Sequence, residues 1–523
     1  MKNIKLTGLI ILAVITFSCV NDLDTEPKVE LSLQELLQKD PEAINGIMSK
    51  LYGSFALSGP NGAGSSDISD DPGESPFLRG ILNLQDFTAD AMKNRWGDDG
   101  LDQLTTTSQW DSNNKFFRYL YNRVYYTVPQ CNNLLSILNN VDIPNKEQTI
   151  SEVRFLRSLA YYYMIDCFGK GVILTEDDLG TTTPLPQASR LELFNFVESE
   201  LLDIENNISL TNSYGKANKS AVRMLLGKLY LNAEVYTGAP RWNDAFIYSG
   251  KVINEGGYSL ESNFRKNFSS DNNTSSEIIY PLIADALNSQ SFGNTTYIVN
   301  GSLNSANMSL NDYGALQGWA GHRSSKAWYG LFGDLNSTTD VRGQLFWQTG
   351  QTYEMTDYKE WTNGFPSIKF TNLNSDGTGI STDFSSTDFP LFRLADAYLM
   401  NVEAQIRKDG SANSQSLGYV NLIRNRANAT PITSLPPSGY TSHVLGTSDA
   451  LCFILDERAR ELNFEGHRRS DLIRFNAFTG SNYIWPWKGG VANGTSIPST
   501  YKLFPIPATA LDANPNLTQN PGY

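Results

Sequence analysis

The sequence predicts a mainly α-helical protein, a scaffold of tetratricopeptide-like helical hairpins with a large irregular, loop-rich face that carries short strands. Apolar residues spaced three and four apart recur through the first half of the chain, as in amphipathic helices. The segment Leu226-Gly227-x-x-Tyr230 matches the inner face of a tetratricopeptide helix, where glycine lets the partner helix approach closely. No strict repeat period runs through the chain, so we expect irregular spacers between the hairpins.

Five helices are expected before residue 257, each with small or apolar residues along one face. Gly169 is placed to end the second helix, and Gly238 with Pro240 to end the fourth. The expected helices cover residues 44–55, 153–167, 193–204, 225–236 and 245–252.

The amino-acid composition changes over residues 257–388, where Asn, Ser, Thr and Gly dominate and aromatic residues are scattered among them. Such composition predicts loops with short strands. The strands are expected at 278–282 and 297–301.

Helical spacing returns near the C-terminal third of the chain. A helix is expected to begin at Asp388, with Pro390 near its first turn, where a missing N–H costs nothing. Another is expected from Asp449 to Phe464. The tail, 486–523, holds enough Gly, Asn and Pro to be mostly extended.

The first 18 residues have the pattern of a lipoprotein signal peptide. Two lysines precede an apolar run that is shorter than the ~20 residues that a membrane-spanning helix needs. The run ends at Ser18-Cys19, and a small residue before cysteine is the pattern in which the thiol receives a diacylglycerol; the alternative is an ordinary cleaved signal. We expect residues 1–18 to be removed, Cys19 to be lipidated, and 19–38 to tether the protein to a membrane without embedding it.

Composition limits the partners and the redox state. The formal net charge of −14 repels phosphate backbones, which argues against nucleic acid and favours a neutral or cationic ligand. Cys131, Cys167 and Cys452 lie in apolar, helix-patterned segments, so buried free thiols are expected rather than disulfides.

The chain after the tether is expected to divide into two regions that pack intimately as one unit. They are residues 39–256, which carry the ligand loops, and residues 257–523.

No catalytic, metal or cofactor site is indicated by a motif. The three histidines, His322, His443 and His467, are widely separated, and no nucleophile elbow, Walker loop or zincin motif occurs. A carboxylate pair for glycoside hydrolysis stays open, because any two of the 55 acids could converge. The run from Asn372 to Gly377 half-resembles a calcium loop, but it has few carboxylates, and a plain turn is favoured.

The segment 90–100 is the most informative candidate for binding. Trp96 lies between Arg95 and Gly97 and is followed by two aspartates, a poor setting for a core residue. Sugar rings stack on aromatic faces, and carboxylates and amides bind their hydroxyl groups. A carbohydrate platform at Trp96 and a merely exposed turn both remain open at this point.

Several blocks of sequence, in order, resemble one family. They are AspLeuAspThrGluPro after Cys19, and the residues 152–163, 229–238, 388–400, 421–427 and 457–475, followed by PheProIleProAlaThr and GlnAsnProGlyTyr near the end. With these blocks the chain resembles the SusD/RagB family of surface glycan-binding lipoproteins over nearly its whole length.

The resemblance implies an outer-membrane, cell-surface, lipid-anchored protein without catalytic activity. Such a protein sits on a SusC-like TonB-dependent transporter and delivers oligosaccharides to it. The charged run between Glu457 and Asp471 then becomes a structural network, and its spacing of three and four predicts mutual ion pairs along a helix. A surface glycoside hydrolase and a peptide-capturing RagB-like binder remain as alternatives.

The resemblance also implies ligand-binding residues. In starch-binding members an arc of aromatic residues with a nearby Asp and Arg cradles a helical glucan. A second tryptophan of that arc corresponds to Asn94 here, so a fructan such as levan or inulin is as plausible as starch. The expected binding residues are Asp71, Arg79, Asn94, Trp96, Asp98, Trp319, and an aromatic at Phe292 or Tyr297.

Overall fold

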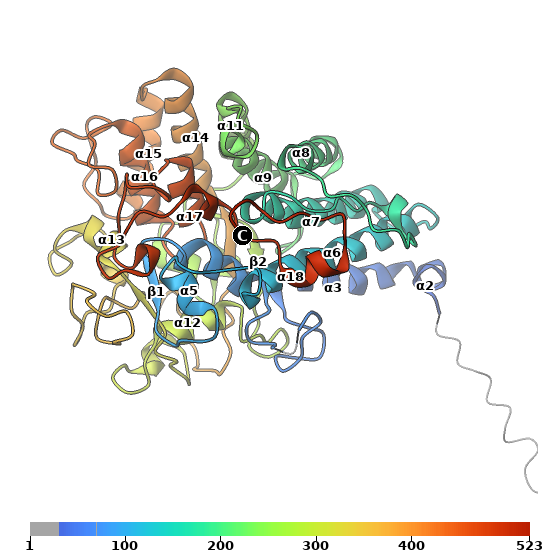
Figure 1. Ribbon diagram of the computed structural model, residues 1–523, viewed down its shortest axis with the longest axis horizontal. Coiled ribbons are helices and arrows are strands. Elements are labelled where there is room, and N and C mark those ends of the chain that lie inside the picture. Colours follow the sequence, from blue (N-terminus) through green and yellow to red (C-terminus); the bar gives the residue numbers. More distant parts are fainter. Residues whose placement is uncertain (1–30, 70) are drawn as a thin grey trace, which may run out of the picture.

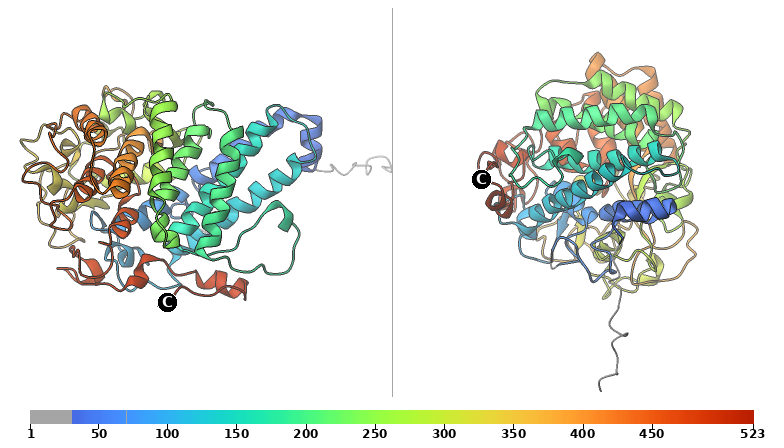
Figure 2. Two further views of the ribbon diagram at one scale, coloured as in Figure 1. Left: turned by 90° about the horizontal axis from the view of Figure 1, so that it is seen from above. Right: turned by 90° about the vertical axis from the view of Figure 1, so that its right-hand side faces the viewer.

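The computed structural model describes residues 31–69 and 71–523, and its helices follow one another as antiparallel neighbours (Figures 1 and 2). Helices α6, α7, α8, α9 and α11 contact one another in turn, α11 contacts α14, and α14 contacts both α15 and α16. Their bounds are α6 (Lys115–Leu138), α7 (Lys146–Cys167), α8 (Arg190–Asn207), α9 (Lys219–Leu231), α11 (Trp242–Glu255), α14 (Leu394–Asp409), α15 (Ser414–Arg426) and α16 (Ala450–Glu461). The helical scaffold with an irregular face of short strands is therefore confirmed.

Gly227 faces two neighbouring helices, as predicted, but the spacing between them does not require glycine. A Cβ on this residue of α9 would lie 3.8 Å from the backbone nitrogen of Ser249 in α11 and 3.5 Å from Met400 Cε in α14. Both are ordinary van der Waals distances, so three helices meet at this residue and alanine would also fit there. Because α11 precedes residue 257 and α14 follows it, helices from both sides of that residue pack against each other here.

Most of the expected helices are present at the expected places. The first lies within α3 (Ile44–Ala56), and α7, α8, α11 and α16 contain or overlap the others. The exception is 225–236, which is split into α9 and α10 (Ala233–Thr237). Asn232 lies at the break, and its side-chain amide donates a hydrogen bond to the carbonyl of Lys228.

Two predictions about the second half are wrong. Residues 297–301 are not a strand but lie in helix α12 (Thr295–Ser302), whose first turn is capped by the Asn294 side chain. The helix expected from Asp388 begins only at Leu394, because 389–393 form strand β4, antiparallel to β2 (Ile278–Leu282). Pro390 lies opposite Pro281 there, at an irregular point of the ladder where neither residue can donate an N–H.

Three smaller expectations are met. The cysteines Cys131, Cys167 and Cys452 are buried free thiols. The run from Asn372 is a turn, in which Asn372 donates to the carbonyl of Gly314 and Asp376 accepts from Thr378. The tail is mostly irregular, with the short helix α18 (Ala508–Ala513).

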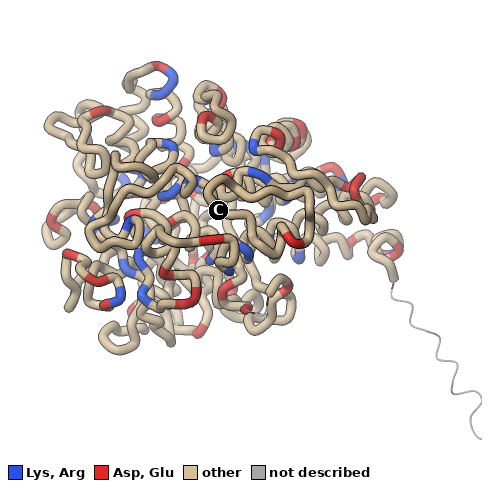
Figure 3. Tube along the Cα trace, viewed as in Figure 1, with Lys and Arg blue, Asp and Glu red and all other residues tan. Residues whose placement is uncertain are grey.

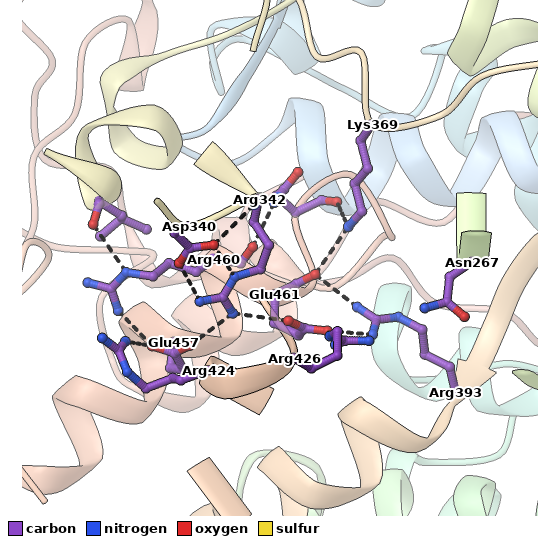
Figure 4. Close-up of polar contacts among 12 residues, drawn as sticks. Asn267, Asp340, Arg342, Lys369, Arg393, Arg424, Arg426, Glu457, Arg460 and Glu461 are labelled. Atoms are coloured by element: carbon purple, nitrogen blue, oxygen red, sulfur yellow. Dashed lines mark hydrogen bonds and ion pairs between the residues drawn. The ribbon is translucent and has the colours of Figure 1, made fainter. Parts of the chain in front are cut away.

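The charged run in and after α16 is buried and structural, as expected, but its pairing differs from the prediction (Figure 4). Glu457 and Glu461 do not pair mainly along their own helix. Glu457 forms an ion pair with Arg342 Nη1 at 2.9 Å, and Glu461 forms ion pairs with Arg342 at 3.0 Å and Arg393 at 2.7 Å. These arginines come from a loop and from β4, because the carboxylates point inward toward neighbouring elements rather than along the helix surface.

Burial alone would raise the pKa of Glu457, but Arg342, Arg460 and Arg424 overcome that effect and lower it to about 2. The same competition lowers the pKa of Glu461. The network therefore holds its carboxylates charged inside the core and ties α16 to α15 and to β4.

The N-terminal predictions fall mostly outside the described residues. Residues 1–18, Cys19 and most of 19–38 are among those not described. The described end of the expected tether already contains helix α2 (Leu33–Lys39), capped by Ser32. No helix in the described part of the chain is long and apolar enough to cross a membrane.

Candidate ligand-binding site

A two-stranded ribbon forms the base of the site. Strand β1 (Met92–Asn94), labelled in Figure 1, is one of its strands. It lies antiparallel to β3 (His322–Ser324), with Asn94 opposite His322. The loop before β3 is fastened to the end of α12, because the N–H groups of Trp319 and Gly321 donate to carbonyls of that helix at 2.7 and 2.8 Å. The two segments that carry Trp96 and Trp319 are thus fixed to one another.

Trp96 and Trp319 form a tilted pair of half-buried indoles. Their ring centroids are 6.3 Å apart at an interplanar angle of 60°, and the indole N–H of Trp96 donates to the carbonyl of Trp319 at 2.8 Å. A Cβ on Gly321 would lie 2.4 Å from the Trp96 ring, so glycine is needed for the ring to pack on the backbone. Trp96 is therefore held in a defined orientation, which is not the arrangement of a merely exposed turn.

Arg79 lies beneath this pair and organises the acidic side of the site. Its guanidinium is 4.5 Å from the ring centre of Tyr297 and 5.7 Å from that of Trp96. It contacts Glu74 at 3.4 Å and Asp98 at 3.5 Å. The arginine comes from helix α4 (Phe77–Leu82) and is buried, so it positions aromatic rings and carboxylates from below.

Asp71 and Phe292 lie on the flank of the site. Asp71 Oδ1 accepts the N–H groups of Gly73 and Glu74, both at 3.0 Å, and so shapes the turn before α4. A Cβ on Gly73 would lie 3.7 Å from Phe292 Cβ. Phe292 is 37% exposed and rests on Phe384, with ring centroids 5.0 Å apart.

The expected residues are thus brought together, but they divide into two layers. Asp71, Trp96, Asp98, Phe292 and Trp319 are partly exposed. Arg79, Asn94 and Tyr297 are buried, and the last two are 0% exposed, so these three lie beneath the surface layer and their contact with a ligand stays a prediction. Between Phe292 and Tyr297, only Phe292 reaches the surface.

His322 supports the platform from below and was not assigned a role from the sequence. Asn94 lies 3.0 Å from its Nδ1, and its Nε2 lies 3.0 Å from the carbonyl of Tyr297, so the ring accepts from the amide and donates to the carbonyl. Burial lowers the pKa of His322 to about 3. The neutral ring therefore fits this environment, whereas a protonated Nδ1 would face another donor.

We expect acid to destabilise the protein partly through His322. Its folded-state pKa is depressed, so between pH 6.5 and about 3 the folded state binds fewer protons than the unfolded state, and stability falls with pH. His322→Gln keeps an acceptor and a donor without titrating. Urea unfolding should show that the stability advantage of the wild type over His322→Gln shrinks by roughly 2–3 kcal/mol between pH 7.5 and pH 4.5. A constant difference would contradict this role.

Two polar residues at the rim were missed. The Gln317 side chain accepts the indole N–H of Trp319 at 3.1 Å and donates to Asp383 at 3.0 Å. Gln317 belongs to the GlnGlyTrpAlaGly segment that marks Trp319, but Asp383 is distant in sequence and only the fold brings it near. Together they fix the outer indole and offer an amide and a carboxylate beside it.

The arrangement suits a ligand with apolar faces and many hydroxyl groups. Two indoles present tilted faces, and Asp98, Asp71 and Gln317 lie around them with hydrogen-bonding atoms. Among the described residues no group of three or more His, Cys, Asp or Glu is placed to hold a metal ion. Fold and site define an α-helical ligand-binding protein with an aromatic platform.

Comparison with known proteins identifies the family. The SusD family profile matches residues 240–523. The starch-binding protein SusD of Bacteroides thetaiotaomicron is 31% identical over 97% of this chain and 96% of its own length. The chain therefore belongs to the SusD family.

Solved structures share the fold. A surface glycan-binding protein A from Bacteroides thetaiotaomicron, in complex with laminarihexaose, has a TM-score of 0.69 at 17% identity and covers 92% of this chain and 99% of its own. A SusD superfamily protein from Parabacteroides distasonis has a TM-score of 0.70 at 21% identity with the same coverage. At these identities the likeness supports the fold alone.

Proposed function

We propose that this protein binds a neutral glycan at the cell surface, without catalysing a reaction, and delivers it to a SusC-like TonB-dependent transporter. The observation that carries the proposal is the fixed pair of indoles at Trp96 and Trp319, with polar side chains around it. The similarity of the chain to a starch-binding protein over nearly its whole length supports the same class of ligand.

Electrostatics favour a neutral ligand. Acidic and basic residues are intermixed along the chain in Figure 3, and the formal net charge is −14. A polyanion would be repelled by this net charge, whereas a neutral sugar chain is not. Starch-like glucans and fructans such as levan both satisfy this requirement.

The carboxylates at the site support binding rather than hydrolysis. Asp71 is engaged with two backbone N–H groups and Asp98 with Arg79. Each thus has a structural partner, which favours a positioning role over proton transfer to a glycosidic bond.

The test is retention of the purified protein on native affinity gels that contain starch, laminarin, levan or inulin. We expect slower migration on one of them and no release of reducing sugar. Unretarded migration on all four would contradict glycan binding, and sugar release would favour the hydrolase. Retention by immobilised peptides alone would favour the peptide-capturing alternative.

Anchoring of the protein through Cys19 is part of the proposal. Its support is the Ser18-Cys19 junction after a short apolar run. We expect labelled fatty acid to be incorporated by the wild type and not by Cys19→Ala. Equal labelling of both would refute lipidation at this position, and co-purification with a large outer-membrane barrel after mild detergent extraction would support the delivery step.

A further inference from the structure

A second aromatic surface adjoins the Trp96 platform. Tyr358 and Trp487, both half-buried, have ring centroids 5.0 Å apart at an interplanar angle of 69°. They come from loops that are distant in sequence. Neither residue was singled out by sequence reasoning.

Arg323 joins this surface to the first site. Its buried guanidinium donates to the carbonyl of Gly321, on which the Trp96 ring packs, at 2.9 Å, and also to the carbonyls of Tyr358 and Glu360. Because these carbonyls share one planar guanidinium, the Trp96 and Tyr358 segments lie side by side.

Lys359 forms a second link between the two segments. Its ammonium is bound by both oxygens of Asp102, at 2.7 and 2.6 Å, and lies 2.9 Å from the position of a Cβ on Gly97, the residue after Trp96. These contacts therefore link the segments that carry two ring pairs, and we call the four residues Trp319, Trp96, Tyr358 and Trp487 the strip.

The loop that carries Trp487 is rigidly supported. Lys488 is fully buried and donates to the carbonyls of Gly480 and Tyr483 at 3.0 and 2.7 Å, with its ammonium 4.3 Å from the Trp485 ring centre. The N–H of Gly490 donates to the carbonyl of Thr106, which joins the loop to the segment after α5 (Leu101–Thr105). A ring held in place in this way loses little freedom on binding.

Polar groups accompany this second surface. Asp357 and Glu360 flank Tyr358 and Lys359 and are exposed, as is Asp99 on the neighbouring loop. The composition repeats that of the first site, with aromatic faces for sugar rings and carboxylates for hydroxyl groups. The occupant that fits both is a single extended chain of neutral sugars.

We infer that Tyr358 and Trp487 form a distal subsite, which binds the continuation of a glycan chain already held at Trp96 and Trp319. The inference rests on the proposed function. It makes a specific statement about ligand length: short oligosaccharides occupy the first platform alone, and longer ones reach the second.

Trp487→Gly removes the distal ring with little risk to the fold. Trp487 has a φ of 72°, a left-handed conformation that favours glycine over any bulky residue. Trp487→Phe retains an aromatic face. Trp347→Ala is the matched control, since Trp347 is also half-buried but belongs to neither the Trp96–Trp319 nor the Tyr358–Trp487 ring pair.

The probes are trisaccharides and octasaccharides of the maltose, laminaribiose, inulin and levan series. The series that the wild type binds is chosen first, and calorimetry then measures the Kd of its trisaccharide and its octasaccharide for each variant. We expect Trp487→Gly to leave trisaccharide affinity within twofold and to weaken octasaccharide binding about tenfold. Trp487→Phe should retain most of the affinity, and Trp347→Ala all of it.

Two outcomes separate the inference from the function on which it rests. If Trp487→Gly binds the octasaccharide as tightly as the wild type, the distal subsite is refuted and glycan binding stands. If the wild type binds no sugar in any series, the proposed function fails and the subsite fails with it.

Discussion

Replacing Arg393 by methionine should lower the free energy of unfolding by about 3–5 kcal/mol. The buried guanidinium of Arg393 contacts Glu277 at 2.8 Å, Glu461 at 2.7 Å and Glu465 at 2.7 Å. Its removal leaves three buried carboxylates short of positive charge, and the uncompensated charge outweighs the apolar contacts that methionine restores. Urea unfolding at pH 7 measures the loss.

The control is an ion pair of the same kind at the surface. Lys326 pairs with Glu354 at 2.8 Å, but their side chains are 44% and 60% exposed. Lys326→Met should change the stability by less than about 0.5 kcal/mol, because water and salt already screen such a pair. Arg393→Lys keeps the charge without the planar fork and should fall between wild type and Arg393→Met. Equal stability of the Arg393→Met and Lys326→Met variants would show that the buried network is not what holds α16 to β4.

The helices show where sequence periodicity is sufficient and where it fails. α3 and α8 could be predicted because each buries one apolar stripe. The long helix α6 was not predicted, although its buried apolar residues recur three and four apart; Pro129 in its interior is the residue that argues against one continuous helix. Residues 297–301 carry β-prone side chains, but the Asn294 cap and complete burial favour the helix α12.

The charged run shows a different limit. Spacing of three and four predicts pairs along one helix, but it cannot reveal partners from distant segments. Glu461 binds Arg342, Arg393 and Arg426, none of which is near it in sequence. The structural role could be expected from the sequence, whereas the partners could be found only from the fold.

The candidate site was proposed from the resemblance, but its division into an exposed and a buried layer could not be. Trp96 and Trp319 are partly exposed, as a platform requires, whereas Asn94 and Tyr297 lie beneath it. Burial depends on the packing of α12 against β3, which no local pattern encodes. The supporting role of His322 was invisible for the same reason.

Alanine at Trp319 or at Trp96 should each weaken glycan binding by roughly 30-fold or more, since loss of an aromatic hot spot costs about 2 kcal/mol. The two variants differ in their effect on folding. Trp96 packs against Tyr297 and His322 with centroid distances of 5.9 and 5.1 Å, so its removal should also lower the Tm. Trp319 has Trp96 as its one aromatic neighbour within the described residues, and its removal should leave the Tm close to that of the wild type.

Trp319→Ala is therefore the decisive variant, and calorimetry with the polysaccharide that the affinity gels select is the measurement. Trp347→Ala should bind as the wild type does, because Trp347 is half-buried but is not among the ring contacts of Trp96 or Trp319. Trp328 is unsuitable as a control, since it is 1% exposed and its loss would disturb the core. If Trp319→Ala and Trp96→Ala both bind with wild-type affinity while remaining folded, sugar rings do not stack on this indole pair, and the ligand site must be sought elsewhere on the loop-rich face.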